Sequence, residues 1–176
     1  DGFSEAEKVP VAEMPELERY VLHLLADMDA KLAQAVDDFD YNSYVRLLSD
    51  FANNDLSAFF FDIRKDSLYC DAATSPKRRA YRTVLDILFH ALIRYAAPVL
   101  VFTAEEVWQT RFPDEAESVH FLEWPEVPFA ATRHPREGGD RVENEAPDSQ
   151  TGPRLRGGDD GLMAKWEQLR YFRSTA

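Results

Sequence analysis

Apolar side chains recur every three or four positions from Pro15 to Phe39, with polar and charged residues between them. This spacing predicts an amphipathic α-helix. Pro15 suits the first helical turn, and Glu16 and Glu18 suit its electropositive end. The predicted core face comprises Leu17, Val21, Leu24, Met28, Leu32, Ala35 and Phe39. The polar residues 1–12 are expected to form a frayed lead-in.

A second helix is predicted from Asp40, whose carboxylate can cap its first turn. The run Asn53-Asn54-Asp55 contains poor helix formers, so we expect a kink there. Asp55 lies near the apolar face and needs a hydrogen-bonding partner if it is buried. The predicted core face of this helix comprises Tyr44, Leu48, Phe51, Ala52, Leu56, Phe59 and Ile63.

A third helix is predicted to start at Ser75-Pro76, with a capping hydroxyl followed by a proline, and to end at Pro98. Its predicted buried stripe is Val84, Leu85, Leu88, Leu92 and Tyr95.

The run Thr103-Ala104-Glu105-Glu106 has the form of a capping box for a short fourth helix that ends near Arg111. Phe102 and Val107 can form a hydrophobic staple around this start. Four helices with short turns predict an all-α fold, an antiparallel helical bundle over residues 13–130.

The next segment, residues 131–161, is rich in Gly, Pro and charge and has almost no large apolar side chain. Such a segment cannot bury enough surface to offset its ordering entropy, so we expect a disordered insertion. Residues 162–176 resume helical periodicity with Met163, Trp166 and Leu169, and are expected to start a C-terminal helical segment.

Length and composition narrow the class of protein. A chain of 176 residues can bury a stable core without metals or disulfides, and its single cysteine, Cys70, fits a reducing, cytoplasmic setting. No apolar run approaches the ~20 residues of a membrane span. Because the chain starts at Asp1 rather than Met, we interpret it as a piece of a longer soluble protein.

Charge is unevenly distributed along the chain. The net charge is −12, yet residues 63–111 carry 8 basic and 5 acidic side chains between two acidic flanks. Such a basic middle can guide a polyanion to one face, although ordinary surface patterning gives the same counts.

The strongest local signal is a group of four cations, Lys77, Arg78, Arg79 and Arg82, in the first two turns of the third helix. The helix dipole disfavours cations there by a few tenths of a kcal/mol each. A bound phosphate would resolve this conflict, because it favours both free backbone amides and guanidinium groups. The alternative is that the side chains extend into water and pair with Asp71 or Asp86.

A second basic pair, Arg64 and Lys65, lies near the end of the second helix. If the second and third helices are antiparallel neighbours, this pair joins the Lys77–Arg82 group in one patch. Tyr69, in the predicted connection, can either stack on an unpaired RNA base or pack against the helices. We therefore predict a nucleic-acid contact made by Arg64, Lys65, Tyr69, Lys77, Arg78, Arg79 and Arg82.

Catalytic and metal-binding patterns are lacking. The four histidines, His23, His90, His120 and His134, are scattered, and Cys70 has no second cysteine or nearby histidine. We predict no catalytic residue, no metal site and no cofactor in this chain.

The runs Asn54–Asp71, NDLSAFFFDIRKDSLYCD, and Ala97–Trp108, APVLVFTAEEVW, resemble the anticodon-binding helical domain of the isoleucyl-tRNA synthetases. The resemblance covers about residues 14–128 and resumes at 162–176. It implies a class I aminoacyl-tRNA synthetase bundle that grips the anticodon stem and loop of tRNA-Ile.

The resemblance also implies that ATP, magnesium and possible zinc sites lie in other parts of a monomeric parent enzyme, outside this fragment. The valyl and leucyl synthetases share the bundle and are one alternative. A second alternative is a helical protein–protein interaction module that uses exposed Trp108, Trp124 and Trp166.

Overall fold

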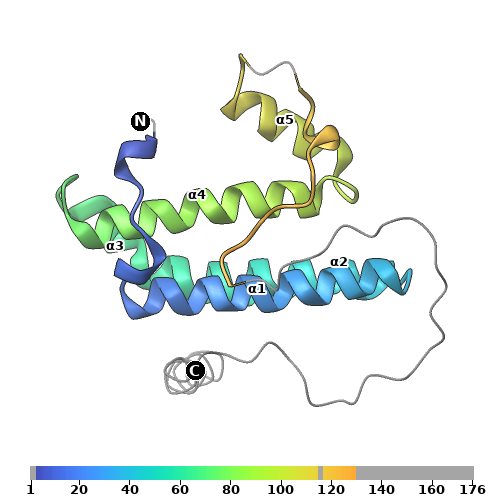
Figure 1. The fold of residues 1–176 in the computed structure, drawn as a ribbon, viewed down its shortest axis with the longest axis horizontal. Helices are drawn as coiled ribbons and strands as arrows, with labels where there is room; N and C mark the ends of the chain where they lie inside the picture. The colour runs from blue at the N-terminus through green and yellow to red at the C-terminus, as the bar shows by residue number, and fades with distance from the viewer. Residues whose placement is uncertain (1–2, 115–116, 130–176) are drawn as a thin grey trace.

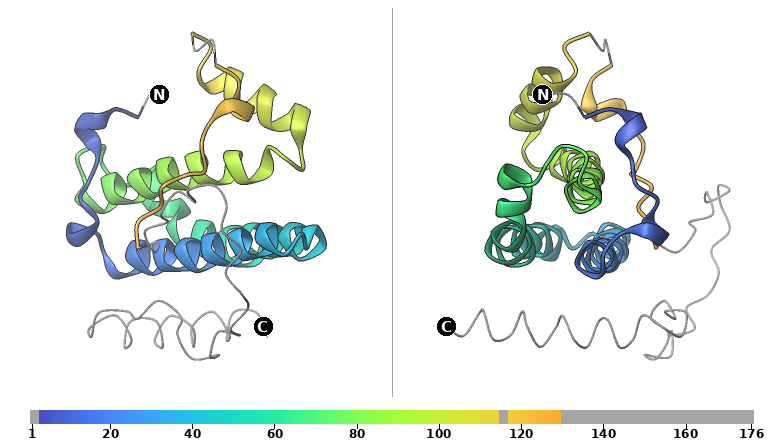
Figure 2. Two further views of the ribbon diagram at one scale, coloured as in Figure 1. Left: turned by 45° about the vertical axis from the view of Figure 1, so that its right-hand side comes forward. Right: turned by 90° about the vertical axis from the view of Figure 1, so that its left-hand side faces the viewer.

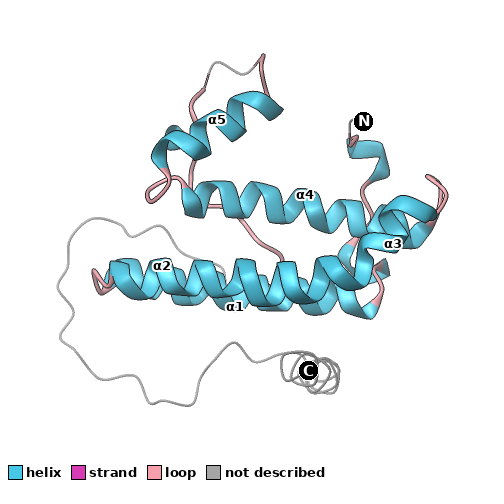
Figure 3. Cartoon of the chain, turned by 180° about the vertical axis from the view of Figure 1, so that it is seen from behind, coloured by secondary structure: helices cyan, strands magenta, loops and turns pink. Residues whose placement is uncertain are grey.

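Helices joined by short turns make up most of the part of the chain that the computed structural model describes, residues 3–114 and 117–129 (Figure 1). The α-helices are α1 (Glu16–Asp37), α2 (Tyr41–Asp50), α3 (Asp62–Cys70), α4 (Pro76–Ala96) and α5 (Val101–Arg111). A π-helical segment, η3 (Phe51–Phe61), joins α2 to α3. Three short 3₁₀ turns are η1 (Glu5–Glu7), η2 (Val11–Glu13) and η4 (Val119–Phe121). Within the described residues there is no strand (Figure 3), which confirms the all-α prediction.

Three helical paths, α1, then α2 with η3 and α3, then α4, run alternately in opposite directions (Figure 1). The path through α2, η3 and α3 returns along α1, and α4 then runs back across both (Figure 1). Seen from the end, α1, the α2–η3 path and α4 form the corners of a triangle, with α5 beyond α4 (Figure 2). This arrangement confirms the predicted antiparallel bundle.

The core lies inside that triangle. Its largest fully buried side chains include Tyr20, Tyr95, Phe59, Phe60, Leu17, Leu22, Leu25, Leu32, Leu56 and Leu88. A second cluster lies between the end of α4, α5 and η4, and consists of Ile93, Ala97, Ala104, Trp108 and Val119. Of the predicted face of the first helix, all positions are buried except Phe39, which is 76% exposed at a left-handed φ of 56°. The chain leaves the helix at this residue, so its side chain turns outward.

The second predicted helix is correct in its start and different in its middle. The Asp40 carboxylate accepts a hydrogen bond from the Ser43 amide at 3.0 Å, as a capping residue should. Hydrogen bonds from the Ser43 side chain and from its backbone lower the pKa of Asp40. A kink was expected at residues 53–55, but the path stays helical there and widens into η3. A π-helix pairs residues five apart, which changes the register of the apolar face. Phe59 and its neighbour Phe60 are consequently both buried.

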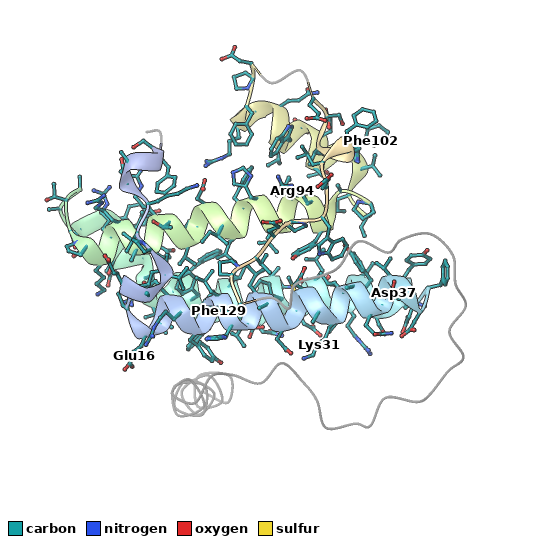
Figure 4. All side chains as sticks on the ribbon, viewed as in Figure 1. Glu16, Lys31, Asp37, Arg94, Phe102 and Phe129 are labelled. Carbon is teal, nitrogen blue, oxygen red and sulfur yellow. The ribbon has the colours of Figure 1, made fainter. Side chains whose placement is uncertain are left out.

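Two predicted helix caps are wrong. Ser75 precedes α4 as predicted, but its hydroxyl makes no capping hydrogen bond. α5 begins at Val101, so Thr103 lies inside the helix and the run from Thr103 is no capping box. The turn that contains Pro98 ends at Leu100, whose amide donates to the Ala96 carbonyl at 2.7 Å. The next helix therefore begins before Thr103. Phe102 is 89% exposed and extends from the outer end of α5, so it forms no staple (Figure 4).

The start of the chain is attached to the bundle and does not fray along its described part. The Val9 amide donates to Thr83 Oγ1 of α4 at 3.2 Å, and Val9 and Val11 pack against the main core. Residues on the N-terminal side of the predicted boundary at 13 therefore contact the bundle. The insertion predicted at 131–161 and the helical segment predicted at 162–176 lie outside the described residues.

The segment that follows η4 returns across the bundle to α1 (Figure 4). Its Trp124 Nε1 donates to Asp29 Oδ1 at 2.6 Å, and Phe129 stacks on His23 with ring centroids 3.9 Å apart. Trp108 is buried in the second cluster, so the exposed surface predicted for it is wrong. Trp166 lies outside the described residues. In the part of the chain that the structure describes, no helix has the length and apolar character of a membrane span.

Candidate nucleic-acid interface

The end of α3 and the start of α4 lie next to each other, as the predicted patch requires. A connection of five residues, 71–75, joins Cys70 to Pro76, and the two helices are in contact (Figure 1). The residues predicted to contact nucleic acid therefore gather at one end of the bundle. Their surroundings differ, however, and divide them into four sets.

Arg64 faces into the protein. Its Nε and Nη2 donate to the two carboxylate oxygens of Glu18 at 2.7 and 2.8 Å, a bidentate pair. The Glu18 side chain is 0% exposed and that of Arg64 is 11% exposed. This arginine joins α3 to α1, and its charge is compensated inside the bundle.

Lys65 and Tyr69 lie on the outer side of α3. Lys65 Nζ contacts Asp62 Oδ1 of the preceding turn at 2.9 Å, in a solvent-exposed pair of the kind that contributes little to stability. Tyr69 is 82% exposed, so the packing alternative for its ring does not apply. An exposed ring beside cations is suited to stacking on an unpaired base.

Lys77 and Arg78 lie in the first turn of α4. Neither forms an ion pair with a carboxylate of the described residues, and Asp71 and Asp86 do not neutralise them. Arg78 Nε is shielded from water and has no hydrogen-bond partner among the described residues. The unfavourable placement of cations at a helix start is thus not relieved by neighbouring acidic groups.

Arg79 and Arg82 hold the N-terminal segment. Arg79 Nη2 donates to the Ala6 carbonyl at 2.9 Å, and Arg82 Nη1 contacts Glu7 Oε2 at 2.6 Å. The Arg82 guanidinium also lies 5.6 Å from the centroid of the Phe3 ring. These two arginines therefore border the predicted patch and are engaged by residues 3–7.

A further charged cluster, not predicted as a site, surrounds Asp86 on α4. Its carboxylate lies 2.8 Å from Arg111 Nη2, 3.8 Å from His90 Nε2 and 3.9 Å from Lys8 Nζ. Burial lowers the pKa of His90, opposed by Asp86. The sequence gives little warning of this cluster, because Lys8 and Arg111 come from segments distant along the chain.

The described residues contain no group of three or more His, Cys, Asp or Glu side chains placed to hold a metal ion. Cys70 is exposed and unpaired. The cations and Tyr69 at the α3–α4 end offer contacts to an anionic ligand but no acid, base or nucleophile arranged for catalysis.

Comparison with known proteins assigns this architecture. Residues 18–146 match the family model described as the anticodon-binding domain of tRNA ligase. The chain is 67% identical to the isoleucine–tRNA ligase of Zymomonas mobilis over 132 residues, which cover 72% of the chain. It is 42% identical over 169 residues, 96% of the chain, to the isoleucine–tRNA ligase of Agrobacterium fabrum. The corresponding enzyme of Ruegeria pomeroyi is 50% identical over 135 residues, 76% of the chain.

These alignments cover 14–15% of the length of each relative, so the chain corresponds to about one seventh of those proteins. The match begins at residue 18, in the first turn of α1, and includes α2 to α5 and the returning segment. The chain belongs to the family of anticodon-binding domains of tRNA ligases.

Proposed function

We propose that this chain is the part of a cytoplasmic, monomeric isoleucine–tRNA ligase that binds the anticodon stem and loop of tRNA-Ile. The names of its relatives and the matched domain support this assignment. The ATP-dependent joining of isoleucine to the tRNA, with its magnesium and any zinc, belongs to other parts of the longer protein.

One observation carries the location of the RNA contact: Lys77 and Arg78 stand at the start of α4 without a carboxylate partner in the described residues. Phosphate oxygens would meet free backbone amides and two cations at this point. Lys65 extends the cationic surface along α3, and exposed Tyr69 supplies a stacking surface beside it.

We assign different roles to the other predicted residues, according to their contacts. Arg64 positions α3 through Glu18, so we assign it a supporting role. Arg79 and Arg82 fix the N-terminal segment at the edge of the surface. Phosphate contacts of this kind orient the RNA and carry no sequence information by themselves.

The test is a titration of the 176-residue chain with the anticodon stem-loop of tRNA-Ile, followed by fluorescence anisotropy at two salt concentrations. An unrelated stem-loop serves as the control. We expect tighter binding of the isoleucine stem-loop and a steep loss of affinity at higher salt, because released counterions drive phosphate binding. Equal affinity for both RNAs, or no binding at low salt, would contradict the proposal.

A second candidate function rests on a different surface. The turn between α4 and α5 exposes Leu100, and Phe102 in the first turn of α5 and Phe121 of η4 are also exposed. An apolar surface of this kind is suited to protein contacts, here with the remaining parts of the longer protein. Binding through it would change little with salt, which separates it from RNA binding.

A further inference from the structure

A cleft of about 440 Å³ opens beside the proposed RNA surface, between the N-terminal segment, α3, α4 and α5. Its walls include Phe3, Leu68, Arg82, Asp86, Phe89 and Arg111. Leu68 precedes exposed Tyr69, and Arg82 belongs to the cationic group of α4, so the cleft adjoins the proposed contact surface. Its volume suits a small planar group, and most of its wall is apolar.

The two arginines of the cleft lie over aromatic rings. The Arg82 guanidinium lies 5.6 Å from the centroid of Phe3. The Arg111 guanidinium lies 4.7 Å from the centroid of Phe89 and 5.5 Å from that of Phe112. Contact with these rings restricts the positions that each guanidinium can take before a ligand arrives. Flat aromatic and guanidinium surfaces are the features on which proteins stack unpaired bases.

The charges around the cleft indicate how a bound nucleotide would be oriented. Asp86 lines the cleft with a side chain that is 10% exposed, so a phosphate placed beside it would meet a buried carboxylate. The cations without carboxylate partners, Lys77 and Arg78, lie at the start of the same helix. A nucleotide whose neutral base lies in the cleft would therefore keep its own phosphate away from Asp86, and phosphates of neighbouring nucleotides would lie toward the start of α4.

We propose that this cleft receives one unstacked base from the loop of the bound RNA, with Arg111 as a stacking residue. This inference rests on the proposed function and adds to it a stacking position for a base, separate from the phosphate contacts. It assigns no identity to the base.

The experiment uses stem-loops of tRNA-Ile in which 2-aminopurine, whose fluorescence changes on stacking, replaces one loop base at a time. Anisotropy of an end label reports binding, and 2-aminopurine emission reports the surroundings of the base. We expect one position to respond on binding to the 176-residue chain and to lose that response with Arg111→Ala. Affinity should fall about 5- to 150-fold, the effect of losing one base stack.

Arg46→Ala is the matched control, because Arg46 is an exposed arginine on α2, outside the cleft. It should leave the 2-aminopurine response unchanged, and circular dichroism would verify the fold of both variants. The stem-loop could bind without any change of emission at a loop position, or Arg111→Ala could keep the full response. Either result would overturn the proposal that the cleft receives a base, and it would leave the proposed function unaffected. Failure of the unaltered chain to bind any stem-loop would overturn both.

Discussion

Arg64 on α3 and Arg78 on α4 lie on neighbouring helices, but a carboxylate in the described part of the bundle neutralises only the first of these two charges. Arg64 meets both oxygens of Glu18, a carboxylate with no exposed surface. Arg78 has no acidic partner among the described residues, although it stands where the helix dipole is unfavourable for a cation. An arginine with a neighbouring carboxylate, such as Arg64, thus has a structural role. An arginine that has no such neighbour in the part of the chain that the structure describes, such as Arg78, can bind an external anion.

The largest effect is expected from breaking the buried pair. Arg64→Ala leaves the Glu18 carboxylate buried without its partner, which should lower the free energy of unfolding by about 3–5 kcal/mol. Urea denaturation followed by circular dichroism would measure this loss. Lys31→Ala is the control, because the Lys31–Asp27 pair has side chains 56% and 53% exposed; its effect should stay within about 0.5 kcal/mol. Similar losses in both variants would mean that the buried Arg64–Glu18 pair contributes no more to stability than an exposed ion pair.

The opposite behaviour is expected at the start of α4. The double variant Lys77→Glu with Arg78→Glu should weaken binding of the anticodon stem-loop about tenfold or more for each lost contact. The slope of log affinity against log salt should become shallower by about 1 per contact. Stability should rise slightly, because acidic residues suit a helix start.

The control for this double variant is Lys31→Glu with Arg46→Glu, which makes the same change of net charge on α1 and α2. Anisotropy titrations and urea denaturation of both double variants give the two readouts. Equal loss of RNA affinity in both would mean that only net charge matters. Loss of stability at α4 would mean that its cations hold the fold together.

His90 represents an intermediate case between the buried and the open cation. Burial lowers the pKa of His90 below the ordinary histidine value of 6.5, against the attraction of Asp86. The folded state therefore binds a proton less readily than the unfolded chain. Stability from this group is fully present above about pH 6.5 and is lost as the pH falls through the lower folded pKa. NMR titration of the His90 ring should give a midpoint below 6.5, and a midpoint above it would contradict the burial.

The smallest effect concerns the exposed cap of α2. Hydrogen bonds from Ser43 lower the pKa of Asp40 below 3.8, so its contribution is present above that pH and is lost as the pH falls through the lower folded pKa. Asp40→Asn keeps a capping oxygen but cannot ionise. Thermal unfolding should show a small advantage of the unaltered chain at neutral pH, which disappears in acid. An unchanged advantage at low pH would assign the effect to something other than ionisation.

Much of the fold follows from local pattern in the sequence. The period of apolar residues predicts α1, and Ser75-Pro76 and Pro98 bracket α4 to within a few residues of its observed bounds. The start of α5 is different, because its first turn is closed by the backbone hydrogen bond from the Ala104 amide to the Leu100 carbonyl and not by a side-chain cap. The π-helical register of η3 likewise reflects packing of Phe59 and Phe60, which local propensity does not encode.

The site is predictable only in part for the same reason. The cationic group at the start of α4 conflicts with the helix dipole, so a local rule identifies it. The partners Glu18, Glu7 and Ala6 are 46, 75 and 73 residues away from the arginines they contact. No local signal reveals such distant pairs, and they decide which cations remain on the surface.

Asp29 determines how the last described segment comes away from the bundle. Its Oδ1 accepts from Tyr95 of α4 and Trp124 of the returning segment, both at 2.6 Å, from within α1. One oxygen atom of α1 therefore binds both α4 and the returning segment. If the segment detaches, the Asp29 carboxylate becomes exposed while it still accepts the hydrogen bond from Tyr95 of α4. Amide hydrogen exchange in residues 119–129 should consequently be slower than their surface position suggests, with protection that follows the opening of α4.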